Sequence, residues 1–227
     1  IGTVTATDPE DDLVTFTVSG SELAITSAGV LTFTSAPDYE TKTSYTATVT
    51  ASDGTNTTTQ NITVNVTNLN DNSPVFTSGA TFSAAENQTS IGTVAATDVD
   101  SEDSSITFII SGSELSITSS GVLTFTSAPD YETKSSYTAT VTASDGTNST
   151  TQNITVNVTN LNDNAPVFTS GATFSADENQ TAIGTVTATD GDGDSVTFTV
   201  SGSELAITSA GVLSFASAPD YETKSSY

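Results

Sequence analysis

The sequence predicts an all-β protein built of tandem Greek-key β-sandwiches joined end to end, and three observations predict it. Apolar and small polar residues alternate with a period of two, as Val14, Phe16 and Val18 do in VTFTV, which is typical of strands with one buried and one solvated face. Glycine and serine separate these segments, as turn residues do. The whole pattern then recurs along the chain, so the folding unit is expected to be smaller than the chain.

The recurrence defines the domain organisation. IGTV begins at residues 1, 91 and 183, and SAPDYETK begins at 35, 127 and 217, so the interval is 90–92 residues. A unit of this size is long enough to bury its own core. We therefore predict a first repeat over 1–72 that lacks its first strand, a complete second repeat over 73–164, and a third repeat over 165–227 that lacks its last two strands.

The complete repeat shows the strands in order. Seven short strands within about 100 residues favour an antiparallel, immunoglobulin-like sandwich of Greek-key type. The predicted strands lie around 75–84, 91–97, 105–110, 113–118, 122–127, 136–143 and 151–159.

Composition excludes several classes of function. The net charge is −24, with three lysines, no arginine and no histidine, and nucleic acid is excluded as a partner because phosphate binding requires clustered cations. Cysteine is absent, which excludes disulfides, thiolate metal sites and thiol nucleophiles. No apolar run approaches the length of about 20 residues that a transmembrane helix needs, and a signal peptide or an anchor is expected outside this segment.

Two short segments lie between the predicted domains. NLNDNSPVF (68–76) returns as NLNDNAPVF (160–168), and its proline stiffens the linker. Amide, carboxylate and backbone oxygens are concentrated there, and hard cations prefer such ligands. The up-and-down strand order places further acids at the end where the chain enters the second repeat, namely Asp98, Asp100 and Asp145, and others at the opposite end, namely Glu86, Asp130, Glu132 and Asp163.

These motifs resemble those of cadherin repeats, in the cadherin-like form found in large bacterial surface adhesins, over essentially the whole chain. AEN (85–87) and DEN (177–179) resemble the family's xEN motif, DVD (98–100) and DGD (190–192) resemble DxD, and DYE at 38, 130 and 220 resembles DRE. ASDG at 51 and 143 supplies the aspartate of a fourth motif. The linkers match DxNDN except that Asn68 and Asn160 replace its first aspartate, and DPE (8–10) has Glu10 where DxD has aspartate.

The resemblance implies a group of calcium ions, typically three, at each junction between repeats. The implied ligands of the first junction are Asp38, Glu40, the Leu69 carbonyl, Asn70, Asp71, the Asn72 carbonyl, Asp98, Asp100 and Asp145. Those of the second are Glu86, Asp130, Glu132, the Leu161 carbonyl, Asn162, Asp163, the Asn164 carbonyl, Asp190 and Asp192. Glu22, Glu114 and Glu204 recur in SGSEL, where we expect turn chemistry, and Asp11, Asp12, Glu102, Asp103 and Asp194 are expected to be solvated loop charge.

The expected function is a calcium-rigidified stalk of an extracellular cell-surface adhesin, with calcium ions and neighbouring repeats as its partners. Catalysis is not expected, because only a carboxylate pair could serve as acid and base and a near-copied site in every repeat fits a spacer better. Alternatives are a filament whose copies share strands, and a module that binds carbohydrate or a second copy of itself. The incomplete outer repeats favour either a longer repeat protein or, less strongly, strand supply by neighbouring copies.

Overall fold

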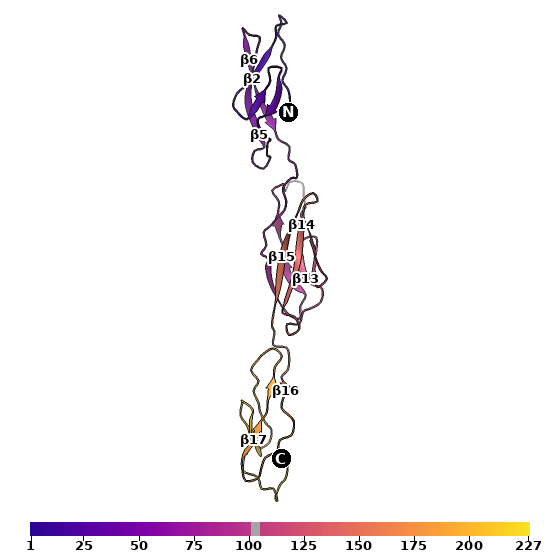
Figure 1. Ribbon diagram of the computed structural model, residues 1–227, viewed down its shortest axis with the longest axis vertical. Coiled ribbons are helices and arrows are strands. Elements are labelled where there is room, and N and C mark those ends of the chain that lie inside the picture. The colour runs from indigo at the N-terminus through magenta and orange to yellow at the C-terminus, as the bar shows by residue number, and fades with distance from the viewer. Residues whose placement is uncertain (101–104) are drawn as a thin grey trace.

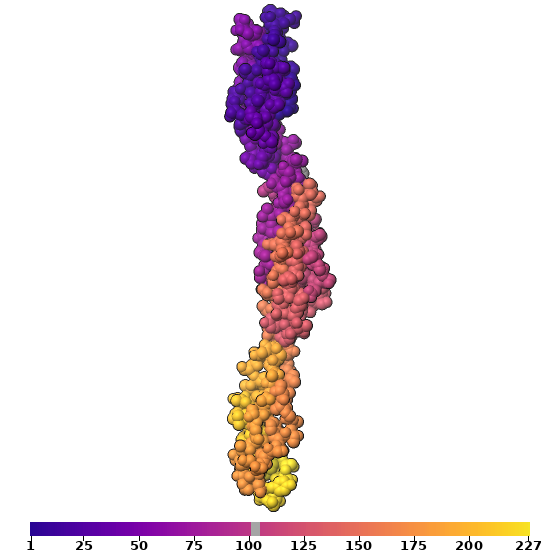
Figure 2. All heavy atoms as spheres, viewed as in Figure 1, coloured from indigo at the N-terminus to yellow at the C-terminus, as the bar shows by residue number. Residues whose placement is uncertain are grey.

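The computed structural model describes residues 1–100 and 105–227. Its strands form three bodies that follow one another along one long axis (Figure 1), and the molecule is a narrow rod in the space-filling view (Figure 2). Strand pairings between described residues stay within β1–β6, β7–β15 or β16–β20, which we call units 1, 2 and 3. The predicted all-β class is confirmed, and the described residues contain no helix. The expectation for Glu102 and Asp103 lies outside the described residues.

Unit 2 is a sandwich whose core is filled from both sheets. One sheet has the order β11-β14-β15-β8 and the other β12-β13-β9, with β7 and β10 forming a separate pair. Leu123 on β13 and Val141 and Val156 on β14 and β15 are fully buried. The strands are β7 (Val75–Phe76), β8 (Thr81–Ala85), β9 (Ser90–Thr93), β10 (Ala96–Thr97), β11 (Thr107–Ile110), β12 (Leu115–Ile117), β13 (Val122–Phe125), β14 (Ser136–Ser144) and β15 (Ser149–Thr159).

Two of the seven predicted strands are each divided in two. The predicted strand 75–84 becomes β7, antiparallel to β10, and β8, parallel to β15. The predicted strand 91–97 becomes β9, which pairs with β13, and β10. The chain changes its pairing partner within each segment because a strand at the edge of a sandwich can contribute to both sheets. Ser78 and Gly79 interrupt the alternation in the first segment, but they do not tell which partner strand each half joins.

Gly121 shows how closely one turn approaches the neighbouring strand. Its φ is 89°, and a Cβ built on it would lie 2.2 Å from the carbonyl oxygen of Val94. The Val94 amide donates a 2.8 Å hydrogen bond to the Gly121 carbonyl. Both the left-handed conformation and the close contact require glycine, and Gly29 and Gly211 meet the same conditions in units 1 and 3.

Units 1 and 3 repeat parts of this arrangement. Unit 1 has sheets of order β1-β4-β3 and β2-β5-β6, and unit 3 has a sheet β17-β20-β19 and the pair β16-β18. The strands of unit 1 are β1 (Gly2–Thr3), β2 (Thr15–Val18), β3 (Leu23–Ile25), β4 (Val30–Phe33), β5 (Ser44–Ser52) and β6 (Thr57–Asn65). Those of unit 3 are β16 (Val167–Phe168), β17 (Ala182–Thr185), β18 (Ala188–Thr189), β19 (Leu205–Ile207) and β20 (Val212–Phe215).

Each unit contains one lysine, held in the same way. Lys42, Lys134 and Lys224 form ion pairs with Glu22, Glu114 and Glu204 at 2.5–2.6 Å. Each ammonium also lies 4.4–4.5 Å from the ring centroid of a tyrosine three residues later. The three glutamates therefore do more than the turn chemistry that we expected, because each one binds the lysine of its unit.

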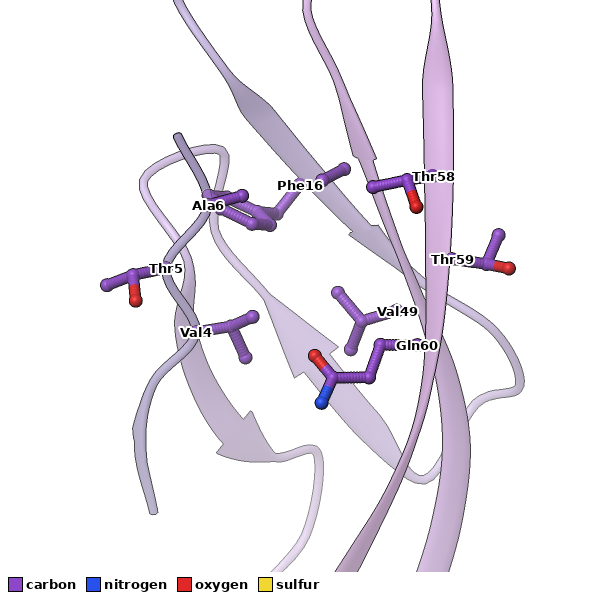
Figure 3. Close-up of a pocket in the computed structure, with 9 residues that line it drawn as sticks. Val4, Thr5, Ala6, Phe16, Val49, Thr58, Thr59 and Gln60 are labelled. Carbon is purple, nitrogen blue, oxygen red and sulfur yellow. The ribbon is translucent and has the colours of Figure 1, made fainter. Parts of the chain in front are cut away.

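A hollow opens on unit 1, between the segment Val4–Ala6 and strands β5 and β6 (Figure 3). Phe16, Val49 and Gln60 line it, and its volume is about 290 Å³. The matching surface of unit 2 is covered, because β8 pairs with β15 and the Phe76 ring lies 6.4 Å from that of Phe108. The described residues of unit 1 include no counterpart of β7 or β8.

Candidate metal centre

Carboxylates are buried at both ends of unit 2. The buried charged side chains among the described residues are Glu86, Asp98, Asp100 and Asp145, with 2%, 8%, 1% and 9% of their surface exposed. Acidic residues are almost never fully buried unless they are paired. The three lysines, however, all pair with the SGSEL glutamates. The buried carboxylates thus have no side-chain cation, and all four had been selected from the sequence as metal ligands.

At junction 1, which we define as the linker 68–72 and the side chains around it, Asn72 connects the linker to unit 2. Its backbone amide donates to Asp100 Oδ2 at 2.7 Å. Its side-chain amide donates to Asp100 Oδ1 at 3.2 Å and to Asp71 Oδ1 at 3.1 Å. Carboxylate oxygens of Glu40, Asp71 and Asp100 lie within 4.8 Å of one another, so one acid from unit 1, one from the linker and one from unit 2 converge.

Among the described residues, three buried side-chain oxygens at junction 1 have no hydrogen-bond partner. They are Asn68 Oδ1, Asp98 Oδ2 and Asp145 Oδ2, and the last two belong to carboxylates. The other oxygens of these carboxylates are engaged, because Asp98 Oδ1 accepts from the Asp100 amide at 2.9 Å and Asp145 Oδ1 accepts from the amides of Thr147 and Asn148 at 2.6 Å. A buried carboxylate oxygen without a donor is costly, and a bound cation would remove that cost.

Hydrogen bonds and neighbouring charges shift the titration of this cluster in opposite directions. Burial alone raises the pKa of Asp100, but the amides of Asn72 donate to the carboxylate and lower its pKa below the ordinary value. The pKa of Glu40 is raised, first by desolvation and then by the negative charges of Asp100 and Asp38. The hydrogen bonds therefore favour the ionised form of Asp100, whereas burial and the neighbouring negative charges favour the protonated form of Glu40.

At junction 2, which comprises the linker 160–164 and its surroundings, Glu86 anchors the linker to the preceding unit. Its Oε1 accepts from the Leu161 amide at 2.7 Å and its Oε2 from the Tyr131 amide at 2.8 Å. The next residue, Asn87, has a φ of 62°, a conformation that asparagine tolerates better than most residues. Its side-chain amide donates to Asp163 Oδ2. The sequence Glu86-Asn87 thus holds both the linker backbone and its central carboxylate.

The following unit contributes Asp192 to the same cluster. Its Oδ2 accepts from the amides of Asp163 and Asn164 at 3.1 and 2.8 Å. The Asn164 side chain donates to Glu132, Asp163 and Asp192 at 3.0–3.2 Å. Carboxylate oxygens of Glu86, Glu132, Asp163 and Asp192 all lie within 4.8 Å of one another. Four carboxylates from two units and the linker therefore converge, and three of them accept a hydrogen bond from the Asn164 side chain.

The pKa shifts at junction 2 follow the same pattern as at junction 1. Desolvation raises the pKa of Glu132, and the charges of Glu86, Asp192 and Asp130 raise it further. The Asn164 side chain is the main cause that lowers the pKa of Asp192. In both clusters the pKa of the aspartate that is bound by linker amides is lowered, and the pKa of a glutamate near it is raised.

The structure brings together many, but not all, of the residues selected from the sequence. The selected carboxylates outside both clusters are those of Asp38, Asp98, Asp130, Asp145 and Asp190. Asp38 and Asp130 accept hydrogen bonds from Thr41 and Thr133 in their own turns. Asp190 and Asp192 also form a group with Asp194, which is exposed as expected and had not been selected. Leu69, Leu161 and Asn162 are residues of the linkers, and both leucine side chains are exposed.

Two asparagines at the junctions had been missed as site residues. Asn87 binds Asp163, and Asn148 donates to the first linker. A further group, Glu178, Asp220 and Glu222, lies at the end of unit 3, and its motifs were identified although its residues were not selected. The xEN motif had pointed to Asn87, but no local pattern marks Asn148, because its partners lie 76–78 residues away.

The donor set fits calcium. All candidate ligands are oxygens, from carboxylates, amides and backbone carbonyls, which calcium accepts in groups of six to eight. At junction 1, Glu40, Asp71, Asp98, Asp100 and Asp145 would hold such ions, and the unpartnered oxygens of Asp98 and Asp145 would be available as ligands. At junction 2, Glu86, Glu132, Asp163, Asp190 and Asp192 would hold them.

Comparison with known proteins places these features in a family context. Residues 80–159 match the family model described as Cadherin domain. The protocadherin-like wing polarity protein stan of Drosophila melanogaster is 34% identical over 197 residues, which cover 75% of this chain and 6% of that protein. The human cadherin EGF LAG seven-pass G-type receptor 1 is 35% identical over 179 residues, covering 72% and 6%. The chain thus spans about 6% of the length of these relatives.

Solved structures show the same architecture. Mouse cadherin-23 EC22-24 superposes with a TM-score of 0.75 at 23% identity, over 98% of this chain and 82% of that one. The protocadherin gammaB7 EC3-6 cis-dimer structure gives a TM-score of 0.75 at 26% identity, over 94% and 62%. The order of sandwiches and linkers is therefore that of tandem cadherin ectodomains.

Proposed function

We propose that this chain, which belongs to the cadherin family, is an extracellular segment that calcium ions at its junctions hold as a straight stalk. Members of this family are adhesion proteins, so the segment would support adhesion at a cell surface by setting the reach of binding domains. The domains would divide at 72/73 and 164/165, as the repeats predict. The role is structural, and no catalysis is assigned to the carboxylate clusters.

One observation carries the proposal. Glu86, Asp98, Asp100 and Asp145 are buried at the ends of unit 2, away from the three lysines. Without cations, acids from adjoining units repel one another across each linker. With cations the same acids attract a shared charge, and the rod becomes stiff.

Calcium would supply positive charge and flexible coordination by several oxygens. The chain's own residues would do the rest. Asn72 and Asn164 orient Asp100 and Asp192, Glu86 holds the linker backbone at Leu161, and Asp71 and Asp163 bring a linker carboxylate to the shared face. Binding to the native state alone would also stabilise it by mass action.

The test is a calcium titration followed by small-angle scattering and thermal unfolding. The maximum dimension is expected to reach that of a straight rod in millimolar calcium, and the melting temperature is expected to rise. Magnesium at the same concentration is the matched control, because it prefers octahedral sites with retained water and should have a smaller effect. Equal dimensions and melting temperatures in chelator and in calcium would refute the clamp.

A further inference from the structure

Asn148 lies in the turn between β14 and β15, at the end of unit 2 that faces the first linker. The turn is organised by Asp145, whose Oδ1 accepts from the amides of Thr147 and Asn148 at 2.6 Å. Gly146 has a φ of 99°, which the turn requires. This local geometry aims the Asn148 side chain away from the strands and toward residues 70–72.

The side-chain nitrogen of Asn148 contacts three oxygens of the linker. Nδ2 lies 2.8 Å from the Asn72 carbonyl oxygen, 3.2 Å from Asn70 Oδ1 and 3.3 Å from the Asn70 carbonyl oxygen. All three are acceptors, so the amide must present its nitrogen, since the opposite orientation would face oxygen with oxygen. Two hydrogens serve three acceptors, with the shortest bond going to Asn72.

From this contact we propose that Asn148 is a positioning residue that docks the first linker onto unit 2 without the help of ions. It also fixes the positions of the Asn70 and Asn72 oxygens at junction 1. The effect on calcium affinity rests on the proposed function, whereas the docking of the linker does not. Donors outside the ligand set commonly tune metal sites in this way.

Unit 1 provides a matched control. The sequence SDGTN occurs at 52–56 and again at 144–148, and Asp53 organises its turn as Asp145 does. Asn56, however, is exposed, and its side chain donates to Asp53 Oδ2 at 3.2 Å. Replacing Asn56 therefore removes a bond within the turn, whereas replacing Asn148 removes the bonds to the linker.

The docking is tested on the full chain in chelator by amide hydrogen exchange. The Asn72 amide donates to Asp100 and reports directly on whether the linker is docked. Asn148→Ala should speed its exchange by about threefold to tenfold, as the loss of one net hydrogen bond predicts. Asn56→Ala should leave this amide unchanged.

The same experiment can overturn the docking. If Asn148→Ala speeds exchange only within 144–149, and by no more than Asn56→Ala does within 52–57, then Asn148 serves its turn alone. Unchanged exchange of the Asn72 amide would contradict the proposal in the same way.

Calcium titration of Asn148→Asp separates a positioning role from a ligand role. An aspartate removes the donor and faces the linker carbonyls with a carboxylate, so the affinity of junction 1 should fall if Asn148 positions the linker. A rise in affinity would make the side chain a ligand and overturn the proposal. If the unaltered chain binds no calcium while Asn148→Ala still loosens the linker, the proposed function fails and the docking stands.

Discussion

Junctions 1 and 2 contain the same NLNDN linker but are held by different hydrogen bonds. At junction 1 the linker is bonded to the unit that follows it, through Asn72 to Asp100 and through Asn148 to the carbonyls of Asn70 and Asn72. At junction 2 the linker is also bonded to the unit that precedes it, through Glu86 and Asn87.

The burial of the acidic side chains also differs between the two junctions. Asp98, Asp100 and Asp145 are buried at junction 1, whereas Asp190 and Asp192 are only partly covered at junction 2. Pro74 is fully buried, while Pro166 is exposed. The linker is the same, but its described surroundings differ, because unit 1 has no counterpart of Glu86 and Asn87 and unit 3 has no counterpart of β14 and β15 among the described residues.

Replacing Glu86 should cause the largest loss of stability and should affect junction 2 but not junction 1. Glu86→Ala leaves the amides of Leu161 and Tyr131 without their charged acceptor, and about 3 kcal/mol of unfolding free energy should be lost in calcium. Urea unfolding measures the loss, and hydrogen exchange should rise at 160–164 but not at 68–72. The control is Glu178→Ala, because Glu178 is exposed and accepts one backbone bond, from Tyr221. Equal losses in the two variants would show that burial at junction 2 carries no extra stability.

Removing the central linker carboxylate should affect calcium binding more than folding. Asp163→Ala should lower the affinity of junction 2 on the order of tenfold, about 1.4 kcal/mol, and Asp71→Ala should do the same at junction 1. Each variant is the control for the other, read by isothermal titration calorimetry and by scattering. Global unfolding of either variant would instead make that aspartate part of a domain's own structure.

Asn68 and Asn160 stand where the DxNDN motif has aspartate. Replacing each with aspartate should change the calcium affinity by a few-fold, and by a different amount at each junction. Asn68 Oδ1 is buried and has no hydrogen-bond partner in the part of the chain that the structure describes, so Asn68→Asp should raise the affinity of junction 1. Asn160 donates to the Asp192 carbonyl at 2.9 Å, and Asn160→Asp gives up that bond and should gain less. Asn65→Asp, at an exposed position of β6, adds the same charge away from both sites. An equal gain in all three variants would mean that only net charge matters.

The smallest effect is expected from the lysines. Lys134→Gln removes an ion pair whose side chains are 42% and 57% exposed, together with an exposed cation–π contact. The expected loss is about 1 kcal/mol or less, and salt should reduce it. Lys42→Gln should behave alike in unit 1, and neither should change calcium affinity. A changed calcium affinity would show that the lysine ion pair helps to position the acidic residues of the neighbouring DYE motif.

Much of the molecule could be predicted from local spacing. Alternation in segments such as VTFTV indicates strands with one buried face. The recurrence of IGTV and SAPDYETK indicates that similar sandwiches follow one another along the chain. The acids of the junctions could be selected because each lies in a short motif, and Glu86, Asp100, Asp163 and Asp192 do lie in the two clusters. The positions of Asp38 and Asp130, which bind their own turns, could not be read from the same motifs.

Sequence alone thus determined the all-β class, the repeat and the acidic junctions, because these depend on residues that are neighbours along the chain. Only the tertiary structure decided where a strand changes sheets at 77–80, which lysine meets which glutamate, and that Asn148 reaches the carbonyl oxygen of Asn72. Those contacts join residues 20–76 positions apart. They exist because the Greek-key path returns distant loops to the same end of a sandwich, which no local pattern records.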